Sequence, residues 1–162
     1  MAILKIVNTK GKYYDENSRE QVLGYILNPY KTPNGYIGSI GIAGDNYAQE
    51  MNNVSVSFGK VDGVQLRHFI ISFESWEVKD PKIAYMIGLD IAEFLGREYQ
   101  TVFSVHEDAE QLHIHLVINS VSFIDGHRYR GTRAEFYGLK NYINMVIGRF
   151  GIAPVRYISG KA

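Results

Sequence analysis

Two apolar runs flank a short acidic segment in residues 101–123, which read TVFSVH-EDAEQ-LHIHLVINSVSF. Both runs are rich in β-branched residues, so they predict two strands, and the acidic segment 107–111 predicts the loop between them. Short loops join antiparallel strands, whereas parallel strands need long crossovers. An antiparallel hairpin is therefore expected here, and it sets the class of fold.

The segments around this hairpin predict further strands and helices. Apolar runs at 2–7 and 64–73 indicate two more strands. Residues 28–38, NPYKTPNGYIG, are typical of a loop. Capping residues before apolar residues at helical spacing predict four helices, which begin at Asn17 or Ser18, Asp45, Asp80-Pro81 and Thr132. We expect an α+β fold in which helices pack on a central antiparallel β-sheet.

Composition limits the kinds of protein and of site. The 162 residues contain no repeat or linker, so residues 1–162 are expected to form one domain. The chain has no cysteine, so any metal must be bound by His, Asp or Glu. The N-terminal residues predict neither a signal peptide nor a membrane span, and a cytoplasmic location is expected. The 17 basic and 17 acidic residues argue weakly against a nucleic-acid partner, although a neutral total can hide a basic groove.

Three of the five histidines fall within the hairpin, at His106, His113 and His115. Side chains alternate between the faces of a strand, so His113 and His115 project from the same side. If the hairpin closes, His106 comes up beside them from the neighbouring strand. A His-x-His pair alone arises easily on a solvated sheet face, but the third histidine and Asp108 favour a metal site. Three ligands leave positions open, as in a catalytic rather than a structural site.

The string H-x-D-x4-H-x-H-L-V-I-N at 106–119 resembles the histidine motif of conjugative relaxases. These are MobP/VirD-like mobilisation nucleases of the HUH endonuclease superfamily. The similarity continues in the same order through 24–32 (GYILNPYKT), 68–77 (HFIISFESWE) and 119–130 (NSVSFIDGHRYR). It covers nearly the whole chain, and the histidine motif is its most specific part. Some relatives carry a further histidine where this chain has Gln111, and three histidines suffice without it.

The resemblance implies a DNA relaxase, an enzyme that nicks single-stranded DNA at a transfer origin (oriT) of a plasmid or integrative element. A tyrosine attacks the phosphodiester and forms a 5′-phosphotyrosyl link, assisted by one divalent metal ion, with Mn, Mg and Zn as candidates. Other proteins of the transfer machinery are the expected partners. Family members usually continue into further domains, so the chain is expected either to be a whole protein or to form the N-terminal part of a longer one.

The nucleophile must be chosen among 12 tyrosines. Tyr25 matches the family position, in the pattern Gly-Tyr-Ile-Leu-Asn-Pro, and lies at the edge of a helix's apolar stripe. Tyr30, in the adjacent loop, is the main alternative, and Tyr13 and Tyr14 are less favoured candidates. Tyrosine is a poor nucleophile at neutral pH because its ordinary pKa is about 10, so a metal on the scissile phosphate would assist.

Several further residues complete the predicted site. Asp108 is expected to orient a metal-bound imidazole or to accept a proton. Phosphate contacts are expected from Lys31, Arg128 and Arg130. Supporting roles are assigned to His68, Glu77 and Asn119. The alternative for His68 is packing, and that for Glu77 is to favour the start of its helix. Two other functions remain open: a rolling-circle replication initiator with the same chemistry, and a DNA-binding module whose metal is structural.

Overall fold

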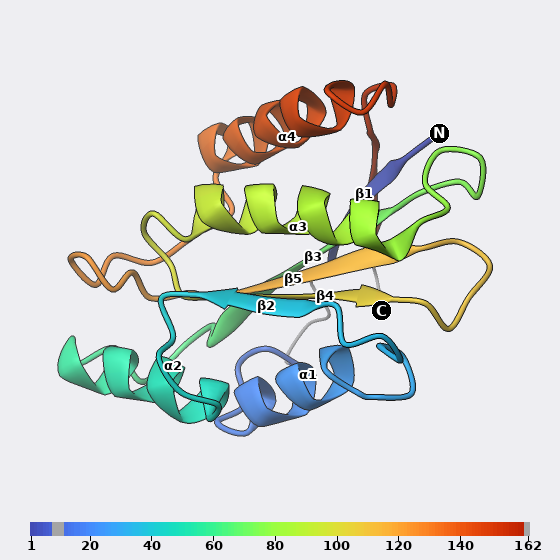
Figure 1. Cartoon of the computed structure of the whole chain (residues 1–162). Coiled ribbons are helices and arrows are strands. Elements are labelled where there is room, and N and C mark those ends of the chain that lie inside the picture. Colours follow the sequence, from blue (N-terminus) through green and yellow to red (C-terminus); the bar gives the residue numbers. More distant parts are fainter. Residues whose placement is uncertain (8–11, 161–162) are drawn as a thin grey trace.

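Six strands form one mixed sheet in the order β2-β4-β5-β3-β1-β6, as seen in the computed structural model, which describes residues 1–7 and 12–160 (Figure 1). All pairings are antiparallel except that between β1 and β6. The strands are β1 (Ile3–Val7), β2 (Ile37–Ile40), β3 (Leu66–Ser72), β4 (Thr101–His106), β5 (His113–Asn119) and β6 (Arg156–Gly160). The α+β class and the central hairpin β4–β5 are confirmed.

Four helices cover the sheet, and they lie on both of its faces (Figure 1). Helices α1 (Ser18–Ile26) and α2 (Tyr47–Ser57) pack on one face, and α3 (Pro81–Leu95) and α4 (Arg133–Gly148) on the other. Each face has its own apolar core, one containing Leu66, Val102 and Val117 and the other Phe69, Phe103 and Leu116. The alternation of side chains along β3, β4 and β5 feeds both cores, which explains why these strands are apolar throughout.

The predicted capping chemistry holds at α3 and α4, is shifted by one residue at α2, and is not seen at α1, where the side chain of the N-cap residue Asn17 makes no capping hydrogen bond. The Asp80 side chain accepts a hydrogen bond from the Lys82 backbone N–H, with Pro81 as the first helical residue. Thr132 and Glu135 form a reciprocal capping box at α4. The second helix is capped by Asn46 instead of Asp45, and it continues to Ser57.

Two short strands differ from the sequence prediction. Ile37–Ile40 was expected to belong partly to a loop, yet it forms the edge strand β2 beside β4. The C-terminal β6 was not predicted, and it pairs in parallel with β1, a partner that lies at the other end of the chain. Both are edge strands of four or five residues. Strand β2 and residues 156–158 of β6 are exposed or half-buried, so they do not show the buried, apolar pattern that identifies the central strands.

Candidate active site

The hairpin β4–β5 brings the three predicted histidines together. His106 ends β4 and lies directly opposite His113, the first residue of β5, while His115 follows two residues later on the same face. The ring centroids of His106 and His115 are 4.0 Å apart, and each lies 5.2 Å from the centroid of His113. One nitrogen from each imidazole lies within 4.8 Å of the other two. The predicted convergence is confirmed.

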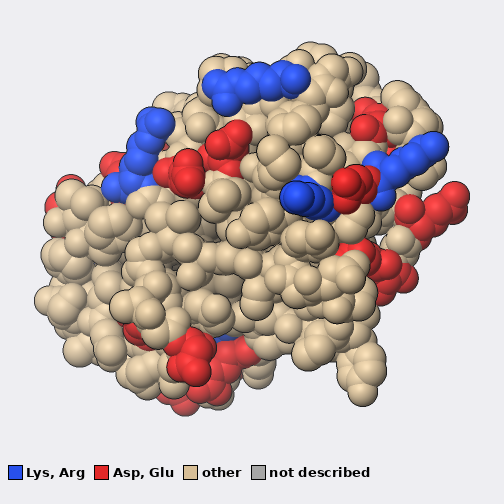
Figure 2. Space-filling view, in the orientation of Figure 1, with Lys and Arg blue, Asp and Glu red and all other residues tan. Residues whose placement is uncertain are grey.

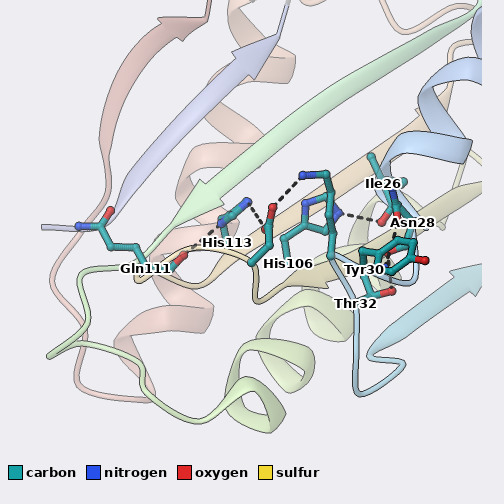
Figure 3. A network of polar contacts seen from close by, with 9 residues as sticks. Ile26, Asn28, Tyr30, Thr32, His106, Gln111 and His113 are labelled. Carbon is teal, nitrogen blue, oxygen red and sulfur yellow. Dashed lines mark hydrogen bonds and ion pairs between the residues drawn. The ribbon is translucent and has the colours of Figure 1, made fainter.

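Hydrogen bonds to backbone carbonyls fix which nitrogen two of these imidazoles present. A carbonyl oxygen can only accept, so His106 donates from Nε2 to Ile26, at 2.8 Å, and its Nδ1 keeps the lone pair. His113 donates from Nδ1 to the Gln111 carbonyl, at 3.1 Å, and presents Nε2. Figure 3 shows both bonds, with the end of α1 reaching His106 and the loop before β5 reaching His113.

The third imidazole is held by another histidine. His115 Nδ1 lies 2.8 Å from Nε2 of His68, and His68 Nδ1 lies 3.1 Å from the Tyr13 hydroxyl. If His115 presents Nε2, its Nδ1–H donates to His68, and His68 in turn donates to Tyr13. The side chains of His115, His68 and Tyr13 are all buried. His68, for which packing was the alternative, therefore lies directly behind a candidate ligand.

The histidines fit a divalent metal ion by two observations. His106 Nδ1 and His115 Nε2 are buried and have no hydrogen-bond partner among the described residues, although buried polar atoms are normally satisfied. Burial also lowers the pKa of His106 and His115, with smaller contributions from neighbouring imidazoles. The pKa of His68 falls to about 3, chiefly through burial. Neutral imidazoles with free lone pairs are the form that binds a metal.

Tyr25, in the last turn of α1, stands over this cluster. Its ring meets the imidazoles of His106 and His115 edge-on, with centroids 5.6 and 5.7 Å away. The residue remains 48% exposed, so the ring is held on one side and open to solvent on the other. Because Ile26, the next residue, accepts the His106 bond, the end of α1 is tied directly to a candidate ligand.

Lys31 and Asp108 form an ion pair beside Tyr25. The Lys31 ammonium lies 2.7 Å from Asp108 Oδ2 and 5.3 Å from the centroid of the Tyr25 ring. Asp108 Oδ1 is 3.9 Å from His113 Nε2. The hydrogen bond between the pair raises the pKa of Lys31 and lowers that of Asp108, so both groups stay charged at neutral pH. A cation and an anion are thus brought to the rim of the histidine cluster.

The other tyrosines considered from sequence lie in different surroundings. Tyr30 is 91% exposed, in the loop after α1, where its backbone N–H donates to the Asn28 side chain (Figure 3). Tyr14 is also exposed, whereas Tyr13 is buried and bonded to His68. Of these four, Tyr25 is the tyrosine in ring contact with His106 and His115.

Arg128 and Arg130 lie at the opposite end of the sheet from the histidines. They line a cleft together with Tyr14, Arg67 and Ser120, the residue that follows β5. The Arg128 guanidinium donates to the backbone carbonyls of Asp62 and Val64, so it also holds the turn before β3. On the face shown in Figure 2, basic and acidic side chains are interspersed, so that face offers no broad basic surface.

Glu77 and Asn119 each bond residues other than the three histidines. The buried carboxylate of Glu77 accepts backbone N–H groups of Ala2 and Glu74, and so fixes the start of β1. Asn119 ends β5, six residues or roughly 20 Å along the strand from His113. Its side chain bonds Arg19, Gln100 and the Met51 carbonyl.

Arg19 is a residue that sequence reasoning missed. It is a buried residue of the first turn of α1, and it donates to Ser55, to the Gln65 carbonyl and to Asn119, at 2.7, 3.0 and 2.9 Å. Burial lowers its pKa to about 10, so it remains charged at neutral pH. In the sequence it resembles an ordinary surface charge of a helix, and no local signal marks it as buried.

The chain is similar in sequence to a known nuclease family and to several of its named members. A family model described as "Relaxase: MobA/VirD2-like, nuclease domain" matches residues 25–152, which include Tyr25, the three histidines and Asn119. A "Protein rlx" of Staphylococcus aureus is 30% identical over 111 residues, 64% of this chain and 35% of that protein. A second "Protein rlx" of S. aureus is 35% identical over 78 residues, 48% of this chain and 24% of that protein.

A more distant similarity extends to another named relaxase. The "Group II intron-interrupted relaxase LtrB" of Lactococcus lactis subsp. cremoris (strain MG1363) is 34% identical over 74 residues, 45% of this chain and 13% of that protein. The chain thus spans about a third or less of the length of these relatives. Among the described residues, no helix is long and apolar enough to cross a membrane.

Proposed function

The chain belongs to the MobA/VirD2-like relaxase nuclease family, enzymes that nick DNA, and we propose that it nicks one strand at a transfer origin. The substrate would be single-stranded DNA of a plasmid or integrative element undergoing conjugative transfer or mobilisation. Other transfer proteins would be its partners in the cytoplasm. We further propose that residues 1–162 form the nicking domain, which further domains would follow in a longer protein.

The main support for this proposal is that the Tyr25 ring packs against His106 and His115, two candidate metal ligands. In the proposed reaction, the Tyr25 oxygen bonds to the scissile phosphorus as the bond from phosphorus to the 3′ oxygen breaks. The phenol loses its proton and the leaving 3′ oxygen gains one. The product is a 5′-phosphotyrosyl link and a free 3′-hydroxyl, and because the phosphoester is kept, the strand can be rejoined without ATP.

His106, His113 and His115 would hold one divalent ion through Nδ1, Nε2 and Nε2. When bound, such an ion would withdraw charge from the scissile phosphate. The remaining work falls to residues of the chain. The bond from His106 to the Ile26 carbonyl keeps the end of α1, and with it Tyr25, against the ligands. Asp108 holds the Lys31 ammonium beside the Tyr25 ring, where it can meet a phosphate oxygen.

The two other functions differ from this proposal in different ways. A rolling-circle initiator shares the chemistry, and the family match over residues 25–152 favours a relaxase. A DNA-binding module with a structural metal would use a closed set of four ligands, whereas three histidines converge here. Such a module would form no covalent product.

The test is the covalent adduct itself. Wild-type protein, Tyr25→Phe and Tyr30→Phe are incubated with Mn²⁺ and labelled oligonucleotides that tile the DNA flanking the gene. Wild type and Tyr30→Phe should form a protein–DNA adduct, and peptide mapping should place the DNA on Tyr25. Tyr25→Phe removes one oxygen while keeping the ring, so it should bind DNA normally and form no adduct. An adduct on Tyr30, or one that persists in Tyr25→Phe, would refute the assignment.

A further inference from the structure

A cleft of about 270 Å³ opens beside Tyr25, on the side of α1 that faces β1. Apolar side chains of β1, α1 and β3 line part of it, and its polar lining comes from Lys5, Lys12, Gln21, Tyr25, His68 and His115. His115 therefore belongs to both the cleft and the candidate metal site, and Tyr25, the candidate nucleophile, also lines the cleft.

The register of the sheet explains why a lysine of β1 faces this site. Lys5 pairs with Ile70 of β3, and Ile70 pairs with His115 of β5. Residues paired across a sheet project from the same face, and neighbouring strands are about 4.8 Å apart. Lys5 thus stands in the same row as His115, two strands or roughly 10 Å away.

The charges around the cleft point to a phosphate ligand. Within residues 1–7 and 12–160, neither Lys5 nor Lys12 forms an ion pair with a carboxylate. By contrast, the Lys31 ammonium is paired with Asp108, and the Arg128 guanidinium donates to two backbone carbonyls. Two ammonium groups that have no carboxylate partner among the described residues, beside apolar side chains, suit a ligand with one flat apolar part and one anionic part.

A nucleotide has these two parts. Clefts that bind single-stranded DNA combine a positive rim for the backbone with a surface that contacts the face of a base. At about 270 Å³, this cleft has room for a single base with its sugar. Resting on the proposed nicking function, we propose that the cleft binds the nucleotide next to the scissile phosphate, with Lys5 and Lys12 on the flanking phosphates.

The first test measures the salt dependence of DNA binding. A labelled oligothymidylate of about 12 nucleotides falls within the usual site sizes of roughly 4–16. Each lost phosphate contact should lower the slope of log affinity against log salt by about 0.7, so Lys5→Ala and Lys12→Ala together should lower it by about 1.4. Arginine at both positions should restore the slope. Lys140→Ala, on α4 across the sheet, is the matched control and should leave it unchanged.

The second test places the nucleotide. In an oligonucleotide that forms the Tyr25 adduct, 5-iodouracil next to the scissile phosphate should crosslink on irradiation to the peptide that spans 12–25. Crosslinks confined to 62–67 or 128–130, or unchanged slopes in the double alanine variant, would overturn the proposal. If the slopes fall but no tiled oligonucleotide yields an adduct, the DNA cleft stands and the nicking proposal fails. If the adduct forms and the slopes stay unchanged, nicking stands and the cleft assignment fails.

Discussion

Replacing His68 with Phe tests whether the buried chain from His115 through His68 to Tyr13 prepares the metal site. His68 is the hydrogen-bond partner of both His115 and Tyr13, and all three side chains are buried. Phenylalanine keeps a ring in the same space but has no polar atom. His115 then has no acceptor for its Nδ1–H, so nothing selects the tautomer that presents Nε2, and nothing fixes the angle of its ring.

The expected loss of metal affinity follows from the loss of the hydrogen bond between His68 and the candidate ligand His115. Removing such a partner usually weakens metal binding 10- to 100-fold, or by about 1.4–2.7 kcal/mol. At a metal concentration of about 100 times the wild-type Kd, the ion stabilises the wild-type protein by about 2.7 kcal/mol. The same metal concentration should stabilise the His68→Phe protein by only about 0.4–1.4 kcal/mol. For a domain of this size, the metal-induced rise in Tm should fall from about 5–11 °C to about 1–6 °C.

The assay compares metal affinity, from competition with a chromogenic chelator, with the rise in Tm on adding Mn²⁺ or Zn²⁺. His127→Phe is a matched control, because it also removes a bond between a histidine and a tyrosine, that to Tyr99 at 2.7 Å, away from the three histidines. It should bind metal like the wild type. His68→Gln retains a donor and an acceptor and should recover part of the affinity. A folded His68→Phe with wild-type affinity would refute the assigned tautomers.

Three other predictions concern the ligands, the support of α1 and the DNA contacts. Alanine at any one of the three ligand positions should weaken metal binding and nicking together, and a triple variant that retains its metal stoichiometry would contradict the site. Arg19→Met leaves three buried acceptors without their donor, so denaturant unfolding should show a loss of about 2–4 kcal/mol. Arg128→Ala and Arg130→Ala should each lower the slope of log DNA affinity against log salt by about 0.7. Arg128→Ala should also lower the Tm, because the bonds of Arg128 to two backbone carbonyls are lost.

Local patterns predicted the parts of the molecule that depend on neighbours in sequence. The hairpin β4–β5 follows from two apolar runs and a short loop, and once it closes, alternation places His106, His113 and His115 on one face. The caps at Asp80 and Thr132 likewise depend on residues two or three positions away. For these elements, all the interacting residues lie within one short segment of the sequence, so a local pattern is enough to predict them.

The parts that escaped prediction depend on distant partners. Strand β6 exists because β1, more than 150 residues earlier, offers an unpaired edge. Lys5 faces the site only because β3 lies between β1 and β5, an order that no local pattern specifies. The helices divide between both faces because each central strand is apolar on both sides, and an apolar run alone does not show which face a given helix covers.

The position of Asn119 gives a physical reason for the extent of the motif H-x-D-x4-H-x-H-L-V-I-N. Its first residues supply the three imidazoles at one end of β5, and Asn119 stands at the other end of that strand. There it accepts a hydrogen bond from Arg19, which lies near the start of α1, while His106 donates to Ile26 at the end of the same helix. Helix α1 is therefore fixed at both ends to the hairpin that carries the candidate ligands. If either bond is lost, Tyr25 should shift relative to the histidines, so Asn119→Ala should slow adduct formation even where metal affinity is retained.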